Sequence, residues 1–167
     1  GTGVIATAIK AEAASETATT AAVTSMTALN REAAGAMKRV GVRAATDVTG
    51  YGLLGHLSTL LLQSGVAAEI VAENVPVLPE VSELIIAGHI PSGTRRNLED
   101  LEHRVEFGDQ DETIRLILAD AQTSGGLLIS VPEERLEELM ELLEATGPVT
   151  AMIGRVTEGA PGTIKVL

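Results

Sequence analysis

The sequence predicts an α+β domain in which helices flank a mixed β-sheet. Strand-like and helix-like segments alternate along the 167 residues, a length that fits one domain of ordinary size. Two strand-like segments at the end, residues 149–156 and 162–167, follow each other directly, which argues against a purely doubly wound sheet. Hydrophobic residues make up 45% of the chain and aromatic residues only 1%, so aliphatic side chains and Met must form the core.

The first 40 residues predict one strand and one long helix. Residues 3–9, "GVIATAI", are typical of a strand. Residues 11–20 are rich in Ala, Thr, Ser and Glu and predict a loop or a weak helix. Apolar residues at helical spacing then predict a helix over residues 21–40, and Gly41 is a suitable residue to end it.

The next stretch predicts strands and helices in alternation. "RAATDV", residues 43–48, predicts a short strand. Leucines on one face predict a helix over residues 53–63. "AAEIVA", residues 67–72, predicts the next strand, and residues 80–87 suit a short helix that ends at Gly88.

The rest of the chain predicts two more helices and a strand before the closing pair. Residues 89–111 hold proline, glycines and mixed charges and are the least regular part. "ETIRLILADA", residues 112–121, predicts a helix, and "GLLISV", residues 126–131, predicts a strand. Residues 132–146 form the clearest helix, with acidic residues in its first turn and Gly147 as its stop.

Composition limits the partners and the chemistry. The net charge is -11, so the surface repels nucleic acid and anionic membranes. The chain has no cysteine, which excludes disulfides, thiolate metal sites and cysteine nucleophiles and fits a cytoplasmic location. No apolar run reaches the roughly 18 to 20 residues that span a bilayer, and no signal peptide is visible. The opening "GTGVI" has no methionine, so we expect a piece of a longer protein.

"TDVTGYGLLGH", residues 46–56, is the first candidate site. Asp47 lies between a predicted strand and a predicted helix, where ligands gather in α/β proteins. Its carboxylate can hold a hard cation such as Mg²⁺, Thr49 can supply a hydroxyl, and Gly50 and Gly52 let the backbone approach a ligand. Alternatively, these side chains only bond their own backbone or cap the helix. The residues alone favour the capped turn.

Two other segments carry polar side chains that could form a site. "DAQTSGG", residues 120–126, is either a polar loop that lines a site or a glycine turn after a helix, and the residues alone favour the turn. "SGTRRN", residues 92–97, contains Arg95 and Arg96. This pair either holds an anion such as phosphate or offsets the neighbouring acidic side chains, and both interpretations stay open.

Standard metal and nucleotide patterns do not occur. His56, His89 and His103 are not spaced as a helical zinc pair. There is no GxxxxGK[ST] loop and no strand-linked GxGxxG motif, so no standard phosphate loop indicates an ATP site.

In combination, these segments resemble the selenophosphate synthetase (selenide, water dikinase) family. The matching segments are "TDVTGYGLLGHL", "GTRRNL" and "LADAQTSGGLLISVP", together with the opening "GTGVIATAIK" and "AMIGRV" near the end. They occur in the same order and at compatible spacing over essentially the whole chain, with Tyr51 where the family more commonly has Phe. The chain resembles the C-terminal domain of that enzyme, which is related to the C-terminal domain of aminoimidazole ribonucleotide synthetase.

The resemblance implies a reaction, and it implies which half of the complete enzyme holds the catalytic residues. The complete enzyme would convert ATP, selenide and water to selenophosphate, AMP and phosphate, as a cytoplasmic homodimer. The catalytic Cys or selenocysteine, its Lys and most contacts to Mg²⁺ and ATP lie in the family's N-terminal half. Residues 1–167 would then be a single C-terminal domain, which we expect to fold but to be inactive alone.

The resemblance also implies roles for particular residues. It makes Asp47 a magnesium ligand in the complete enzyme. With the resemblance, the metal role is therefore favoured over the capped turn that the residues alone favour. Thr49 and Gly50 become its supports, and Arg95 and Arg96 remain hypothetical anion contacts. Two alternatives stay open: a non-catalytic ligand- or protein-binding module of the same fold, and a domain of another ATP-using enzyme of this superfamily.

Overall fold

The computed structural model describes residues 1–145 and 149–167. Its first elements are α1 (Thr2–Lys10), α2 (Glu16–Thr27), α3 (Arg31–Val40), β1 (Ala44–Asp47), α4 (Gly52–Ser64), β2 (Ala67–Ile70), the 3-10 turn η1 (Ala72–Asn74) and α5 (Val81–Ile86). They are followed by α6 (Ser92–Asp100), β3 (Val105–Glu106), α7 (Glu112–Ala119), β4 (Leu127–Ser130), η2 (Glu133–Arg135), α8 (Leu136–Glu144), β5 (Gly154–Thr157) and β6 (Ile164–Val166).

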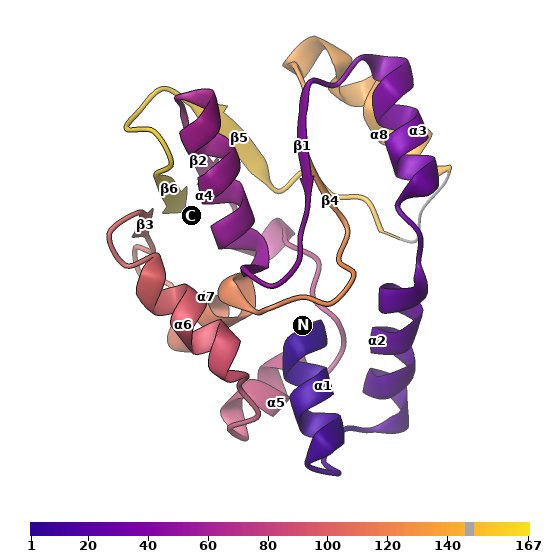
Figure 1. Ribbon diagram of the computed structural model, residues 1–167, viewed down its shortest axis with the longest axis vertical. Coiled ribbons are helices and arrows are strands. Elements are labelled where there is room, and N and C mark those ends of the chain that lie inside the picture. The colour runs from indigo at the N-terminus through magenta and orange to yellow at the C-terminus, as the bar shows by residue number, and fades with distance from the viewer. Residues whose placement is uncertain (146–148) are drawn as a thin grey trace.

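The strands of the described residues form two sheets. The larger sheet has the order β3-β6-β2-β5, in which β2 pairs parallel with β6 and antiparallel with β5. β1 and β4 form a separate antiparallel pair. Figure 1 shows α4, α6 and α7 beside the larger sheet, and α3 with α8 at the other side of the molecule. The predicted α+β fold with a mixed sheet and flanking helices is confirmed.

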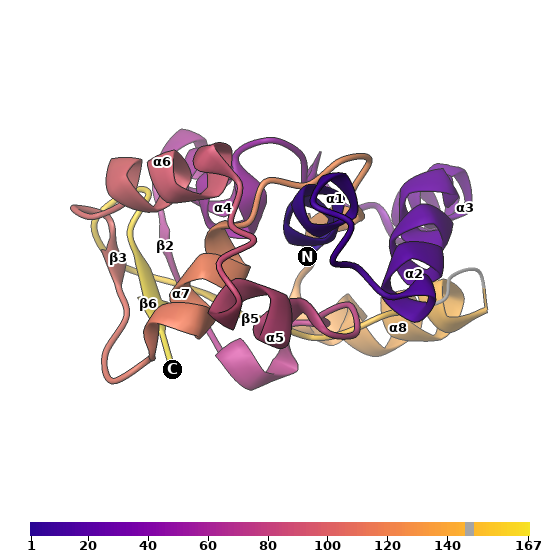
Figure 2. The ribbon, with the colours of Figure 1, turned by 90° about the horizontal axis from the view of Figure 1, so that it is seen from below.

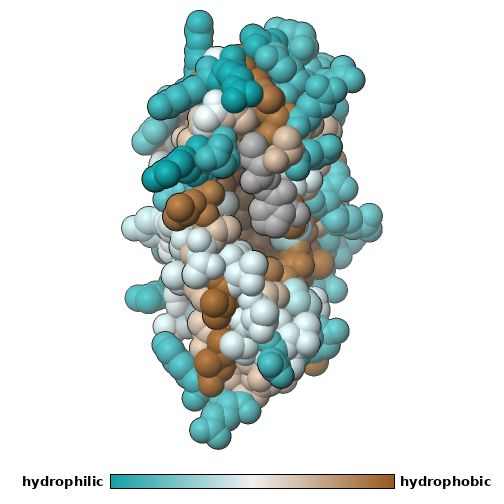
Figure 3. Space-filling view, turned by 90° about the vertical axis from the view of Figure 1, so that its right-hand side faces the viewer, coloured by the Kyte–Doolittle hydropathy of each residue, from teal (hydrophilic) through white to brown (hydrophobic). Residues whose placement is uncertain are grey.

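Three clusters of buried apolar side chains, counted over residues 1–145 and 149–167, hold these layers together. The main cluster joins α4, α7 and the larger sheet, where Leu54, Leu57 and Leu61 lie at the spacing of one helix face. A second cluster joins α1, α2, α5 and α7. α1, α2 and α5 lie in the lower half of the molecule in Figure 1, and α1 and α5 face the viewer in Figure 2, which shows the molecule from below. The third cluster is small and joins α3 to α8 around Leu139. The α2 and α8 side carries apolar patches among weakly polar and charged residues (Figure 3).

The strand predicted over residues 3–9 is wrong, because these residues form α1. Val4, Ile5 and Ala8 are buried together, a spacing that suits one face of a helix. The Asp120 carboxylate caps the start of the helix by accepting the N–H groups of Gly3 and Val4, which lie 117 and 116 residues before it in the chain. The local pattern could not reveal that partner.

Residues 11–20, predicted as a loop or a weak helix, contain the start of α2, and two helices, α2 and α3, replace the single helix predicted over residues 21–40. Ser15 begins α2, because its hydroxyl accepts a backbone N–H of the first turn. The chain breaks between α2 and α3 at Asn30, whose side-chain amide donates to the carbonyl oxygen of Gly125 at 2.9 Å. A tertiary contact therefore accompanies the break.

The stretch 89–111, predicted to be irregular, contains α6 and β3. Pro91 occupies the N-cap position of α6 in an extended conformation. The buried residues of α6 are Thr94 and Asn97. A helix whose buried residues are polar has no apolar stripe, so hydrophobic periodicity could not detect it.

The remaining elements agree with prediction apart from small shifts at their ends. The strands predicted over 43–48, 67–72 and 126–131 and the helices predicted over 53–63, 80–87 and 112–121 are confirmed. Gly41 ends α3 in the left-handed conformation, as predicted. The helix predicted over 132–146 begins as η2 and continues as α8, while position 146 and the predicted stop at Gly147 lie outside the described residues.

The two closing segments do not pair with each other. β5 and β6 lie on opposite sides of β2. β5 starts only at Gly154, not at 149 as predicted, because its partner strand β2 ends at Ile70, the residue opposite Gly154. Within the described ranges, no helix is long and apolar enough to cross a membrane.

Candidate functional site

The candidate site is built around the Asp47 loop, which consists of Asp47 at the end of β1 and of residues 48–51, which join β1 to α4. Asp47 pairs with Leu127 of β4, and its side chain is exposed. Its carboxylate forms no hydrogen bond or ion pair with any residue that the structure describes. The β1–β4 pair thus fixes the backbone and leaves both carboxylate oxygens accessible.

Thr49 is held by hydrogen bonds to His56 and to Gly52. Its backbone N–H donates to Nε2 of His56 at 3.0 Å, and its hydroxyl oxygen lies 3.1 Å from the same nitrogen. Because Nε2 accepts from a backbone N–H, that nitrogen carries no proton in this arrangement. The Thr49 carbonyl oxygen accepts the N–H of Gly52 at 3.0 Å and closes the turn before α4.

Gly50 is held by α6. The side-chain amide of Asn97 donates to the Gly50 carbonyl oxygen at 2.9 Å and to the Ala119 carbonyl oxygen at 3.0 Å. Gly52 has a φ of +67°, and a Cβ at this position would lie 2.5 Å from the Ala119 carbonyl oxygen. Only glycine fits this close approach between the start of α4 and the end of α7.

The segment 120–126 supports the loop through its backbone. The N–H of Gln122 donates to the Thr49 carbonyl oxygen at 3.0 Å, and the N–H of Val48 donates to the Gly126 carbonyl oxygen at 2.9 Å. A Cβ on Gly125 would collide with the Val48 carbonyl oxygen. This segment and the Asp47 loop therefore lie in direct contact, which the sequence order alone did not show.

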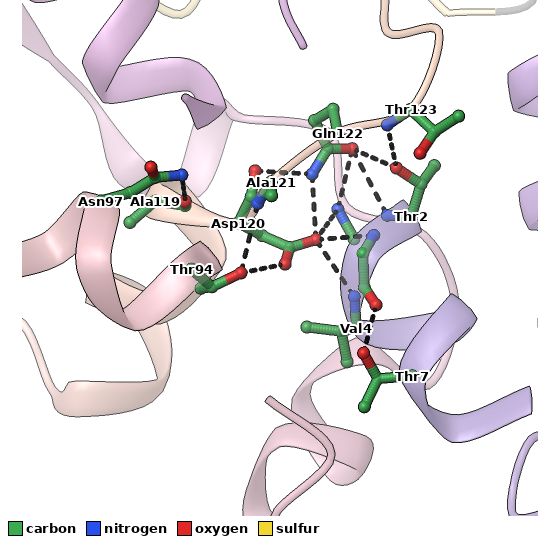
Figure 4. Close-up of polar contacts among 12 residues, drawn as sticks. Thr2, Val4, Thr7, Thr94, Asn97, Ala119, Asp120, Ala121, Gln122 and Thr123 are labelled. Atoms are coloured by element: carbon green, nitrogen blue, oxygen red, sulfur yellow. Dashed lines mark hydrogen bonds and ion pairs between the residues drawn. The ribbon is translucent and has the colours of Figure 1, made fainter. Parts of the chain in front are cut away.

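Asp120 is the centre of a polar network drawn in Figure 4, and its side chain is completely buried. Oδ1 accepts the hydroxyl of Thr94 at 2.7 Å. Oδ2 accepts the N–H of Gly3 at 3.0 Å, the N–H of Val4 at 3.3 Å and the side-chain amide of Gln122 at 2.9 Å. These bonds satisfy the carboxylate and join α1, α6 and the 120–126 segment.

Gln122 extends the network to the start of α1. Its Oε1 accepts from the Gly1 nitrogen at 3.2 Å, and from the Thr2 N–H and hydroxyl at 3.3 and 3.1 Å. Asp120 and Gln122 thus act inside the fold, with their polar atoms directed at α1 and α6.

The paired arginines lie on the exposed surface of α6. Arg95 borders an open cavity of about 520 Å³, and none of residues 47–52 line that cavity. The other lining residues are Leu98, Glu99, Glu102, Val105, Phe107, Gly108, Glu112, Arg115 and Leu116. Arg96 forms no ion pair with the described part of the chain. Of the GTRRN segment, it is Asn97 that reaches the Asp47 loop.

Metal-ligating side chains do not gather in the part of the chain that the structure describes. Among residues 1–145 and 149–167, no group of three or more His, Cys, Asp or Glu side chains could hold a metal ion. His89 is half-buried and His103 is exposed. Asp47 therefore does not belong to a cluster of three or more such side chains among the described residues.

Comparison with solved structures defines the class of fold. Hydrogenase maturation protein HypE in complex with ATP matches with a TM-score of 0.56 and 22% identity, covering 83% of this chain and 36% of that protein. AaThiL complexed with AMPPCP and TMP matches with a TM-score of 0.55 and 18% identity, covering 98% of this chain and 44% of that protein. The chain has the α+β fold found in a part of each of these proteins.

Sequence comparison identifies the family. The family described as AIR synthase related protein, C-terminal domain, matches residues 1–166, and the chain belongs to it. The chain is 43% identical over 166 residues to selenide, water dikinase of Myxococcus xanthus (strain DK1622), which covers 97% of this chain and 47% of the relative. It is 37% identical over 168 residues to selenide, water dikinase 2 of Peptoclostridium acidaminophilum, with 100% and 48% covered. The chain spans about half the length of these relatives.

Proposed function

We propose that residues 1–167 are the C-terminal domain of a selenide, water dikinase. The complete enzyme would make selenophosphate from selenide, ATP and water and release AMP and phosphate, in the cytoplasm and as a homodimer. Two relatives with this name match nearly the whole chain at 43% and 37% identity. Three of the five segments that carry the resemblance, those containing Asp47, Asn97 and Gln122, also lie together around the Asp47 loop.

The observation that carries the proposal is an exposed carboxylate on a fixed loop. Asp47 offers oxygen atoms, which Mg²⁺ prefers, and no described residue competes for them. Bound Mg²⁺ would neutralise charge on the phosphate oxygens of ATP during phosphoryl transfer. One carboxylate cannot hold Mg²⁺ firmly, so Asp47 would complete a site whose other ligands belong to the other half of the enzyme.

Thr49 and Gly50 would support Asp47 indirectly, through the contacts that hold the loop after it. The Thr49 hydroxyl lies against His56, and the Gly50 carbonyl oxygen already accepts from Asn97. Both residues would act by fixing the loop beside the carboxylate. Arg95 and Arg96 are exposed and free of ion pairs within the described residues, which leaves their guanidinium groups able to contact an anion such as phosphate.

The test is a product analysis of the full-length enzyme. With Mg²⁺, ATP and selenide, ³¹P NMR should show selenophosphate, AMP and phosphate appearing in equal amounts, and omission of selenide should suppress selenophosphate. Residues 1–167 alone should give the circular dichroism spectrum of a folded α+β protein and consume no ATP above the blank. ATP consumption by residues 1–167 alone, or no selenophosphate from the full-length protein, would contradict the proposal.

A further inference from the structure

We infer that Asn97 is a positioning residue that holds the Asp47 loop in the geometry required for Mg²⁺. The inference rests on the proposed function of that loop. The sequence drew attention to Arg95 and Arg96 of the same segment, but in the structure it is the next residue that turns inward. Asn97 is 8% exposed, whereas both arginines are exposed.

Asn97 uses its whole donor capacity on two backbone carbonyls. A side-chain amide has two N–H donors, and here one donates to Gly50 and the other to Ala119. Gly50 lies in the loop three residues after Asp47, and Ala119 is the last residue of α7. One side chain of α6 therefore ties the loop to the end of a second helix.

The face of α6 that carries Asn97 is itself held by hydrogen bonds. Thr94 precedes Asn97 by three residues, so both lie on the same face of α6. The Thr94 hydroxyl donates to the buried carboxylate of Asp120 at 2.7 Å and accepts the N–H of Ala121 at 3.2 Å. Thr94 and Asn97 are the two buried residues of α6, and each bonds the end of α7 or the segment after it.

The two halves of the loop have different supports. Thr49 is held by His56 and by the backbone of Gln122, independently of α6. The carbonyl oxygen of Gly50 has Asn97 as its hydrogen-bond donor. Loss of the Asn97 amide should therefore loosen the loop at Gly50 and preserve the contacts at Thr49, a local effect distinct from unfolding.

Asn97→Asp is the decisive variant, because it keeps the shape of the side chain. It removes both N–H donors and places carboxylate oxygens against two carbonyl oxygens. Asn74 provides the matched control: it is exposed, and its amide donates to one backbone carbonyl, that of Met152, at 3.2 Å. Asn74→Asp makes the same chemical change away from the loop.

The first readout is hydrogen–deuterium exchange of the full-length enzyme, followed for the peptide covering residues 46–54. In Asn97→Asp we expect exchange in this peptide to accelerate by about tenfold or more, since local opening governs exchange there. The other peptides of the domain and the Asn74→Asp control should keep their rates. The second readout is the Mg²⁺ concentration for half-maximal ATP consumption, which should rise about tenfold, the size typical of residues that orient metal ligands. The rate at saturating Mg²⁺ should change less.

The outcomes separate this inference from the proposed function. Unchanged exchange in peptide 46–54, or faster exchange across the whole domain, would overturn the positioning role, even if Asp47→Ala still raises the Mg²⁺ requirement. Local loosening with an unchanged Mg²⁺ requirement in Asn97→Asp would overturn the link to the metal. If Asp47→Ala also left the requirement unchanged, the proposed metal role of the loop would fail as well.

Discussion

Replacing Asp120 by alanine should strongly destabilise the domain. The carboxylate is completely buried and accepts four hydrogen bonds from side chains and backbone. Alanine has no side-chain acceptor, so each of these donors loses this hydrogen bond, and only the Gln122 amide keeps a second acceptor, the backbone carbonyl oxygen of residue 120 at 2.9 Å. A buried donor left without a partner costs its full desolvation penalty, which is larger than the net gain of an ordinary hydrogen bond.

The loss of unfolding free energy in Asp120→Ala depends on which of the unpaired donors can bond to water instead. Gly3 and Gln122 are partly buried, so water can replace part of what they lose. Val4 and Thr94 are completely buried and cannot be rescued in this way. At about 1–3 kcal/mol for each buried, unsatisfied donor, these two alone predict a loss of about 2–6 kcal/mol. A domain with a total stability of about 5–15 kcal/mol would be severely weakened.

The assay is urea denaturation of residues 1–167, followed by circular dichroism. Asp111→Ala is the matched control, because this exposed aspartate caps α7 by accepting one N–H, that of Ile114 at 2.9 Å. Loss of such a cap costs about 1 kcal/mol. Asp120→Ala should therefore lose clearly more stability than Asp111→Ala. Equal losses, or a loss below about 1 kcal/mol for Asp120→Ala, would refute the account of the buried network.

Two further predictions concern the Asp47 loop and can be measured in the same assay. Gly52→Ala should destabilise by clearly more than Gly65→Ala: both glycines have a positive φ, but a Cβ at 52 meets the Ala119 carbonyl oxygen and a Cβ at 65 meets nothing within 4 Å. Gly65→Ala should cost about 1–2 kcal/mol from the left-handed backbone alone, and similar losses at both positions would contradict the close approach. His56→Phe removes the acceptor of the Thr49 N–H and should cost about 1 kcal/mol, with faster hydrogen exchange at Thr49. Unchanged exchange there would show that the ring does not hold the loop.

Local pattern predicted the elements whose buried side chains are apolar. α4 carries leucines at helical spacing, and the helix predicted over residues 53–63 differs from the observed Gly52–Ser64 by one residue at each end. α6 has Thr94 and Asn97 as its buried residues and was missed. α1 was predicted as a strand, since Val4 and Ile5 favour strands and the Asp120 carboxylate that caps it lies 116 and 117 residues away from the capped N–H groups.

At the site, too, local pattern did not reveal contacts that form only on folding. Motif resemblance pointed to the Asp47 loop, to the GTRRN segment and to residues 120–126, and the structure brings these three segments together. The sequence did not show which side chain makes the contact. Arg95 and Arg96 stood out by their charge, whereas Asn97 is neutral and its role depends on carbonyl oxygens that converge only after folding. A polar pair at i and i+3, Thr94 and Asn97, was the one available signal of an inward polar face.

The central claim is that Asp47 supplies an oxygen ligand to Mg²⁺ in the complete enzyme. The most direct test compares Asp47→Asn with the wild type in the full-length protein, measuring the Mg²⁺ concentration for half-maximal selenide-dependent ATP consumption. Asp109→Asn, at an exposed aspartate away from the loop, is the control. We expect a rise of about tenfold or more for Asp47→Asn, since even indirect partners of metal ligands have effects of this size. An unchanged Mg²⁺ requirement in a folded Asp47→Asn enzyme would show that the stretch is only a turn between β1 and α4.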